Sequence, residues 1–163
     1  MPNTTIPELK ERFRQAMSSV CTPVSVVTST DSGSPHGTTV SAFASLSMEP
    51  PMVMVSLDRG SELLTLVRTT GSFGLNILAS AQSDLALNFA RKGGSSKFDN
   101  VSWTEDHGVP RLPDAVGFVA CRVEQFVEGG DHIVLLGRVL GADSNAAPPL
   151  TYHGRVFGTH APH

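Results

Sequence analysis

The sequence predicts a mainly β protein, a β-barrel or sandwich with a few helices. Segments rich in β-branched residues recur along the chain, and turn signals built from Gly, Pro, Asp and Ser separate them. A chain of 163 residues, 40% of them hydrophobic, suits one domain with one sizeable core. We therefore expect a single domain over residues 1–163, with an N-terminal helix at about 6–19 and a barrel core at about 20–158.

Three helices are expected. Thr5 and Glu8 fit a capping box for the first helix, and its apolar residues then recur at helical spacing. The segment SELLTLVRTTG predicts a short second helix that ends near Gly71. The segment SAQSDLALNFARKGG predicts a third helix that is capped by Ser80 and stopped by Gly93.

The remaining periodic segments predict strands. TPVSVVTST ends at the turn DSGSPHG, and residues 38–47 follow it, so these two strands are expected to form a hairpin. MVMVSL and FGLNIL predict one strand each. Two long strands are expected on either side of Gly129-Gly130, and LTYHGRVFG predicts a last strand or edge segment.

Residues 38–47 alternate between two kinds of side chain. Mostly apolar residues stand at the even positions, Thr38, Val40, Ala42, Ala44 and Leu46. Mostly hydroxyl-bearing residues stand at the odd positions, Thr39, Ser41, Phe43, Ser45 and Ser47. Because side chains on a strand point alternately to its two faces, this pattern predicts one dry face and one row of short hydrogen-bonding groups. A row without any charge suits a face that a polar ligand approaches closely.

Composition and motifs exclude several classes of protein. The formal net charge of −3 disfavours a nucleic-acid partner, and no run approaches the ~20 apolar residues of a membrane helix. The first residues lack the apolar segment of a secretion signal, so we expect a cytoplasmic protein with Cys21 and Cys121 as buried free thiols. No metal-ligand spacing, GxSxG, Walker or GxGxxG motif is present, so no metal site is expected.

Two further segments have both a functional and a structural interpretation. In FARKGGSSKF, Arg91, Lys92 and Lys97 surround a Gly- and Ser-rich loop that suits an anion, although cations also favour helix C-termini for dipole reasons alone. In EGGDHIVLLGRV, His132 follows a tight turn, where it either faces a ligand or simply begins a strand.

Taken together and in order, these blocks resemble the flavin reductase-like family, the short NAD(P)H:flavin oxidoreductases of two-component monooxygenases. The resemblance runs from about Val20 to Phe157. Its most specific parts are GTTVSAFASLSMEPPMVMVSLDRGS and the GDH block, supported by FGLNILASAQSDLALNFA and PLTYHGRVFG. The chain has Thr38 where the family often has Met and Ala44 where it often has Thr, which leaves the choice of flavin open.

The resemblance implies a split β-barrel with Greek-key strands that works as a homodimer, binds FMN or FAD near the dimer interface and takes hydride from NADH, or alternatively NADPH. The implied flavin-binding residues are Thr38, Thr39, Val40, Ser41, Ala42, Ser45, Leu46, Ser47, Ser56, Leu57, Asp58, Ser61, Phe89, Ala90, Arg91, Lys97 and Phe98. The implied NADH-binding residues are Gly130, Asp131, His132 and Tyr152, with His132 positioning the nicotinamide.

Hydride transfer between two cofactors needs no protein nucleophile, which agrees with the missing acid–base cluster. The expected partner is a separate flavin-dependent monooxygenase that receives the reduced flavin. Three alternatives stay open. The protein could hold flavin without turnover, it could be an oxidase of the pyridoxamine-phosphate oxidase type, or its hydroxyl row could be only a polar interface.

Overall fold

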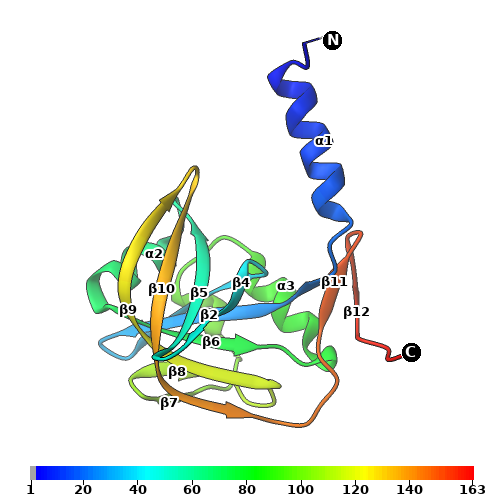
Figure 1. The fold of residues 1–163 in the computed structure, drawn as a ribbon. Coiled ribbons are helices and arrows are strands. Elements are labelled where there is room, and N and C mark those ends of the chain that lie inside the picture. The colour runs from blue at the N-terminus through cyan, green and yellow to red at the C-terminus, as the bar shows by residue number, and fades with distance from the viewer. Residues whose placement is uncertain (1–2) are drawn as a thin grey trace.

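The computed structural model describes residues 3–163 (Figure 1). The helices are α1 (Ile6–Ser18), α2 (Glu62–Thr70) and α3 (Ser83–Ala90), with short 3-10 turns η1 (Ser80–Gln82) and η2 (Ser95–Phe98). The strands are β1 (Thr22–Pro23), β2 (Ser25–Asp31), β3 (Ser34–Val40), β4 (Phe43–Met48), β5 (Pro51–Asp58), β6 (Ser72–Ile77), β7 (Thr104–Asp106), β8 (Val109–Arg111), β9 (Gly117–Gly129), β10 (His132–Ser144), β11 (Thr151–His153) and β12 (Val156–Gly158).

The mainly β prediction is confirmed, and one large antiparallel sheet dominates the molecule. Its seven strands stand in the order β3-β2-β6-β9-β10-β5-β4. β3 and β4 follow one another in the chain but lie at opposite edges, so the hydrogen-bonded ladder is open over residues 3–163 and no closed barrel is found there. The predicted strand content is therefore confirmed, and the split barrel stays a prediction.

Several elements lie where the sequence predicts them. α1 begins with both hydrogen bonds of the capping box between Thr5 and Glu8. Ser61 caps α2, and Gly71 ends it with a φ of 70°, a left-handed conformation that glycine adopts freely. The long β9–β10 hairpin turns at Gly129-Gly130, as expected.

The prediction for residues 38–47 as one strand is wrong. β3 ends at Val40 and pairs with β2, whereas β4 begins at Phe43 and pairs with β5. Between these two strands, Ser41 and Ala42 carry the chain from one edge of the sheet to the other. Because the strand changes partner here, the alternation does not continue across the break, and the supposed dry-face residues Ala42, Ala44 and Leu46 are all exposed in the single chain.

Three other boundaries differ from the prediction. The strand expected at 22–30 is divided into β1 and β2. The expected third helix begins instead as the turn η1, where the backbone N–H of Ala79 donates to the side chain of Gln82 at 2.9 Å, and it ends at Ala90, before Gly93. The last segment is a hairpin of β11 and β12, and the small sheet of β7 and β8 was not predicted from the sequence.

The buried core has two main clusters. One lies between α2 and the inner face of the sheet and includes Val55, Leu57, Phe73 and Leu135. The other surrounds α3 and joins it to β2, η2 and the start of β11 through Val26, Phe89, Phe98 and other apolar residues. This packing places the start of α2 and the end of α3 beside β3, which lines the candidate site.

The two cysteines differ in burial. Cys121 belongs to the core, as expected, and burial raises the pKa of its thiol to about 12. Cys21 is exposed, because it stands in the connection that leads away from α1 rather than inside a strand, so its predicted burial is wrong.

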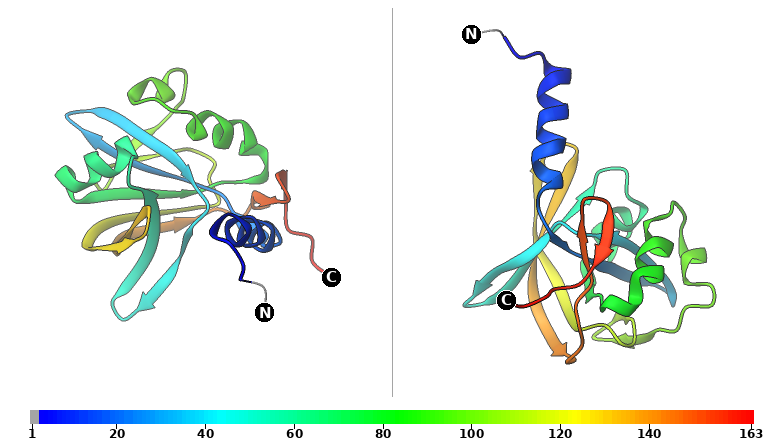
Figure 2. Two further views of the ribbon diagram at one scale, coloured as in Figure 1. Left: turned by 90° about the horizontal axis from the view of Figure 1, so that it is seen from above. Right: turned by 90° about the vertical axis from the view of Figure 1, so that its right-hand side faces the viewer.

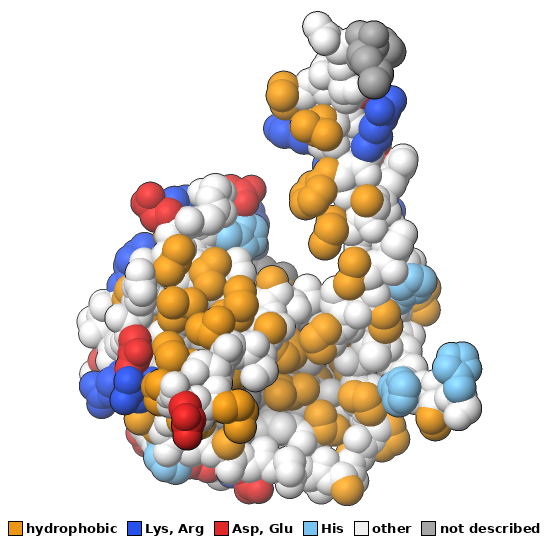
Figure 3. Space-filling model, in the orientation of Figure 1, with side chains coloured by type: hydrophobic (Ala, Val, Ile, Leu, Met, Phe, Trp, Pro, Cys, Tyr) orange, Lys and Arg blue, Asp and Glu red, His pale blue; other side chains and the backbone are white. Residues whose placement is uncertain are grey.

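α1 stands apart from the rest of the molecule. Figures 1 and 2 show it rising from the body next to the β11–β12 hairpin, and the surface in Figure 3 shows a hollow between it and the sheet. All thirteen residues of α1 are described, and none of them is buried. Within residues 3–163, no helix combines the length and the apolar character needed to cross a membrane.

Candidate active site

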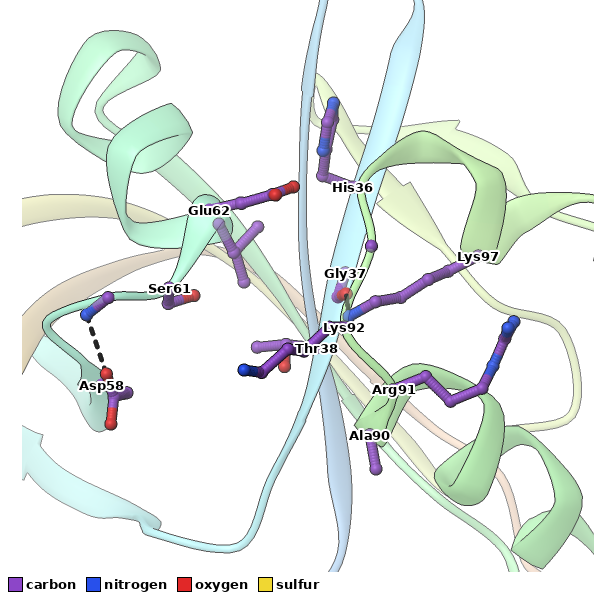
Figure 4. Close-up of a pocket in the computed structure, with 13 residues that line it drawn as sticks. His36, Gly37, Thr38, Asp58, Ser61, Glu62, Ala90, Arg91, Lys92 and Lys97 are labelled. Carbon is purple, nitrogen blue, oxygen red and sulfur yellow. Dashed lines mark hydrogen bonds between the residues drawn. The ribbon is translucent and has the colours of Figure 1, made fainter.

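Two adjoining pockets collect most of the residues that the sequence singles out. The larger pocket, of about 520 Å³, lies between β3, the start of α2 and the segment that follows α3 (Figure 4). The smaller pocket, of about 220 Å³, lies between the β3–β4 connection, the end of β5 and the start of β10. The two share Thr38, Asp58 and Ser61, so they form one continuous cleft.

One wall of the smaller pocket is the chain from Thr38 to Ala42. Thr38, Thr39 and Val40 pair with β2, whereas Ser41 and Ala42, at the break between β3 and β4, are exposed. It is fixed to β5 where the Ser56 N–H donates to the Ala42 carbonyl at 2.9 Å. Hydroxyls and small side chains therefore face the pocket from a segment whose backbone is held in place. The structure thus places five of the residues that the sequence singles out along this wall: Thr38, Thr39, Val40, Ser41 and Ala42.

The loop from β5 to α2 forms the border between the two pockets. The Asp58 carboxylate accepts a hydrogen bond from the Gly60 N–H at 2.7 Å, and the Ser61 N–H donates to the Asp58 carbonyl at 3.0 Å. Ser61 caps α2 through the Leu64 N–H, so the N-terminus of α2 opens into the larger pocket. The first N–H groups of a helix lack intrahelical partners, and the partial positive charge there suits an anion.

The opposite wall of the larger pocket carries the positive charge. Ala90 ends α3, Arg91, Lys92 and Gly93 follow it directly, and Lys97 comes from η2. In Figure 4 the side chain of Lys92 points toward the middle of the pocket, whereas that of Arg91 turns away from it. Glu62 and Asp58, the two carboxylates that line the larger pocket, stand across it from these cations.

Lys97 is a buried lysine, only 5% exposed. Its Nζ donates to the carbonyls of Gly37 and Phe89, each at 3.1 Å, and thereby ties β3 to the end of α3. Burial lowers the pKa of this amine, Glu62 opposes that effect, and Arg91 adds to it. An ammonium group has three donors, so Lys97 keeps one donor beyond these two carbonyls for a ligand in the pocket.

His132 is the first residue of β10 and lines the smaller pocket opposite Asp58 in the β5–β10 ladder. Its Nδ1 lies 2.7 Å from the Asp131 carboxylate, and this hydrogen bond is the main reason why the pKa of Asp131 is lowered. An ionised carboxylate only accepts, so Nδ1 carries the proton and Nε2 is left to meet a ligand. Gly130 and Asp131 do not line either pocket themselves but shape the turn that presents His132.

Some predicted residues lie outside both pockets. Phe89 and Phe98 contact each other in the second core cluster, with ring centroids 4.8 Å apart, and their side chains are buried. Ser45, Leu46 and Ser47 belong to β4 beyond the pocket. Tyr152 lies on β11, where it pairs with Thr22. The centroids of its ring and the Phe157 ring are 5.2 Å apart. One chain therefore does not bring these residues to the cleft.

The sequence reasoning also missed residues of the larger pocket. These are His36, Gly37, Gly60, Glu62 and Leu63, whereas Lys92 and Gly93 belong to the segment that the sequence marks as suited to an anion. Gly37 could have been found from the sequence, because it directly precedes the Thr38 segment. In the structure, a Cβ at this position would lie 3.2 Å from the Phe89 ring. Glu62 and Leu63 are found only once Ser61 is known to cap a helix that opens into the pocket.

The chemistry of the cleft is that of a binding site for a nucleotide-like cofactor. One end offers backbone groups, hydroxyls and an imidazole, which suit a flat polar ring. The other end offers lysines and a helix N-terminus, which suit a phosphate. No group of three or more His, Cys, Asp or Glu residues that could hold a metal is found within residues 3–163.

Comparison with known proteins gives the family. Residues 17–161 match the model described as "Flavin reductase like domain", and the chain belongs to this family. It is 34% identical to the reductase component of 4-nitrophenol 4-monooxygenase/4-nitrocatechol 2-monooxygenase from Rhodococcus opacus, over 99% of this chain and 86% of that protein. It is also 34% identical to the FMN reductase (NADH) SmoA of Agrobacterium fabrum, over 93% and 86% of the two chains.

A solved structure with bound ligands shares this fold. The NADH:FAD oxidoreductase SgcE6 of Streptomyces globisporus, in complex with NAD and FAD fragments, superposes on this chain with a TM-score of 0.89. The two sequences are 28% identical, and the superposition covers 98% of each chain. The family assignment thus agrees between sequence and structure.

Proposed function

We propose that this protein is an NADH-dependent flavin reductase. It transfers hydride from NADH to FMN or FAD and releases the reduced flavin to a separate flavin-dependent monooxygenase. The observation that carries the proposal is the continuous cleft, in which the Thr38–Ala42 segment and His132 meet at one end and the lysines gather at the other. The similar proteins named as a monooxygenase reductase component and as an NADH-dependent FMN reductase support it.

The donor set fits a flavin. We assign the flavin ring to the smaller pocket, where hydroxyls and amides of Thr38, Ser41 and their neighbours can pair with its polar edge. The ribityl phosphate then lies in the larger pocket, near Lys92, Lys97 and the N-terminus of α2. The wall where the two pockets of the cleft meet is formed by Ser56, Leu57, Asp58 and Ser61.

A bound flavin supplies the redox chemistry, so the protein needs only to position the two rings. The small side chains of Ser41 and Ala42 leave room for a second flat ring to approach at roughly 3–3.5 Å. We assign the nicotinamide to the side that His132 borders, where Nε2 can contact its carboxamide. With few charged groups around the smaller pocket, affinity for the flavin stays modest, and this suits release.

We also propose a fold type, an oligomeric state and a cellular location for the chain. The chain is one domain over residues 1–163, a split barrel of Greek-key type in which the Ala42–Ser56 hydrogen bond draws the β3–β4 connection against β5. It works as a homodimer in the cytoplasm. We propose that a second copy of the chain contacts Ser45, Leu46 and Ser47. The same second copy brings Tyr152 to a site. Phe89 and Phe98 support the cleft from the core.

The test is steady-state consumption of NADH by the purified protein, with and without added FMN or FAD and with NADPH as a comparison. We expect rapid consumption only when flavin is present, faster with NADH than with NADPH. A folded protein that binds flavin but leaves NADH unchanged would instead be a flavin-holding module. Consumption of an added amine substrate with dioxygen, independent of NADH, would favour the oxidase alternative.

A further inference from the structure

The larger pocket offers more room than the phosphate of a flavin needs. Its volume is about 520 Å³. A phosphate group has only a few heavy atoms, and at the ~30 Å³ that a water molecule occupies it fills a small part of this space. Pockets of roughly 300–1,000 Å³ hold whole small molecules. With a phosphate seated near Lys92 and Lys97, most of the larger pocket therefore stays open to a further part of the ligand.

The open end of the larger pocket lies between the start of α2 and β3. Glu62 is the first residue of α2, and His36 lies half-buried on β3. A Cβ at Gly94 would lie 3.3 Å from Oε2 of Glu62 and 3.4 Å from Cε1 of His36, so both side chains reach the same point, and glycine leaves it clear (Figure 4). Within residues 3–163, neither side chain makes a hydrogen bond or an ion pair.

The charges around the larger pocket nearly cancel. Lys92 and Lys97 line it together with the carboxylates of Asp58 and Glu62. Arg91 adds little to the positive side, because its guanidinium bonds back to the end of α3. Glu62 also stands at the N-terminus of α2, where a carboxylate offsets the partial positive charge of the helix. Such a site holds a singly charged phosphate better than a doubly charged one.

The two flavin nucleotides differ in this respect. The phosphate of FMN is a monoester with a second pKa of about 6, so near neutral pH it carries a charge of about −2 at one point. In FAD the same phosphate is bonded to a second one, and each of the two carries a single negative charge. FAD also continues into a ribose and an adenine. Glu62 therefore opposes FMN by its charge, and it offers FAD a partner for the ribose.

We propose that Glu62 and His36 make this cleft prefer FAD to FMN. The carboxylate of Glu62 accepts hydrogen bonds from the ribose hydroxyls of the adenosine half, a pairing that acidic residues make in dinucleotide sites. The imidazole of His36 stacks on the adenine. The side chain of Lys92 points into the middle of the pocket, where it meets the second phosphate. The inference rests on the function proposed above and names the flavin that the cleft takes.

NADH carries an adenosine half as well, but continuity of the cleft favours FAD as the occupant. The two pockets share Thr38, Asp58 and Ser61. A flavin whose ring lies in the smaller pocket and whose phosphate lies near Lys92 reaches Glu62 by continuing along its own chain. The nicotinamide is assigned instead to the side that His132 borders, in the smaller pocket.

The test measures the Kd of riboflavin, FMN and FAD by flavin fluorescence in the absence of NADH. For the wild type we expect FAD to bind roughly tenfold more tightly than FMN. In Glu62→Gln we expect the Kd of FAD to rise about fivefold and that of FMN to fall about threefold, with riboflavin changed less than twofold. Glu105→Gln, exposed on β7 outside both pockets, is the matched control and should change none of the three.

A second variant isolates the adenine. His36→Ala should raise the Kd of FAD about fivefold through the lost stacking, while FMN and riboflavin change less than twofold. His160→Ala, which lies exposed near the C-terminal end and outside the cleft, is its control. Because these effects differ in sign or in size between flavins, a general disturbance of the fold, which weakens all three alike, does not imitate them.

The outcomes separate this inference from the proposed function. Equal Kd values for FMN and FAD in the wild type, a comparison that needs no variant, overturn the preference, and so does a shift of both in the same direction in Glu62→Gln. Either result leaves the reductase standing if NADH is still consumed with flavin. A raised KM for NADH with an unchanged Kd of FAD gives the adenosine site to NADH and overturns the inference. A folded protein that binds no flavin overturns both.

Discussion

The Nε of Arg59 donates a hydrogen bond to the carbonyl of Gly130 at 2.6 Å. The backbone N–H of the same arginine donates to the Asp131 carbonyl at 3.0 Å, and its guanidinium lies 3.5 Å from the Glu128 carboxylate. Arg59 thus joins the loop that borders the proposed flavin site to the turn that presents His132. Together with the β5–β10 ladder, Arg59 holds the proposed flavin and nicotinamide sides of the cleft in register.

Replacing Arg59 should affect NADH more than flavin. Arg59→Met removes the side-chain bond to Gly130 and lets His132 move, so we expect the KM for NADH to rise roughly fivefold, from a charged hydrogen bond of ~1 kcal/mol at a partly exposed site. The KM for FMN should change less than twofold. Glu128→Gln is the control, because it removes only the exposed ion pair. Equal changes in both KM values would mean that Arg59 has only a general structural role.

Ser41→Lys introduces a long charged side chain into the proposed ring pocket. Ser41 is exposed, so the fold should survive, while flavin-dependent NADH oxidation should fall at least tenfold because the lysine occupies the space of the ring. Ser34→Lys, at the exposed far end of β3, is the matched control and should keep full activity. Unchanged activity in Ser41→Lys would place the flavin elsewhere.

Lys97→Met separates phosphate binding from ring binding. If the spare donor of Lys97 meets the flavin phosphate, its loss should raise the KM for FMN about tenfold, as expected for a charge-assisted hydrogen bond. Riboflavin has the same ring but no phosphate, so its KM should change by less than twofold. Similar losses for FMN and riboflavin would show that Lys97 acts only through the bonds to Gly37 and Phe89.

The lowered pKa of Lys97 also predicts a dependence of stability on pH. The unfolded chain binds this proton up to about the ordinary value of 10.5, whereas the folded protein releases it at a lower pH. Between these two values the unfolded state holds more protons, so the free energy of unfolding contributed by this group rises with pH. Urea unfolding across this window should show that rise in the wild type relative to Lys97→Met. Parallel curves would contradict the burial of the charge.

The two cysteines should react differently. Burial holds the Cys121 thiol protonated with a pKa of about 12, whereas Cys21 is exposed. A thiol reagent at mildly alkaline pH should therefore modify one thiol per native chain and two per unfolded chain, because the thiolate is the reactive form. Cys21→Ser should abolish the native reaction. Rapid modification of Cys121 in the native protein would contradict its place in the core.

Local patterns predicted much of this fold, and contacts between distant segments account for most of the errors. The capping box at Thr5, the glycine end of α2 and the turn at Gly129-Gly130 depend on neighbouring residues, and the sequence reasoning found all three. The break after Val40 depends on which strand each half pairs with, and alternation alone could not reveal a change of partner.

The same distinction holds for the site. The Thr38–Ala42 segment and His132 were found because hydroxyl-rich and glycine-rich blocks are visible in the sequence. Glu62 and His36 reach the larger pocket only because α2 and β3 approach each other in the fold. The side chains of Phe89 and Phe98 lie in the core and not in the cleft, since an aromatic residue next to a binding residue in sequence often points to the opposite side.

Anaerobic reduction of flavin in large excess over the protein is the most direct test of the proposed function. A catalytic amount of protein is mixed with NADH and many equivalents of FMN, and the loss of oxidised flavin absorbance is followed to its end point. We expect nearly all of the flavin to be reduced, because each reduced flavin leaves the cleft and another enters. Reduction that stops at one flavin per chain would contradict a diffusible product, and no reduction at all would contradict the enzyme.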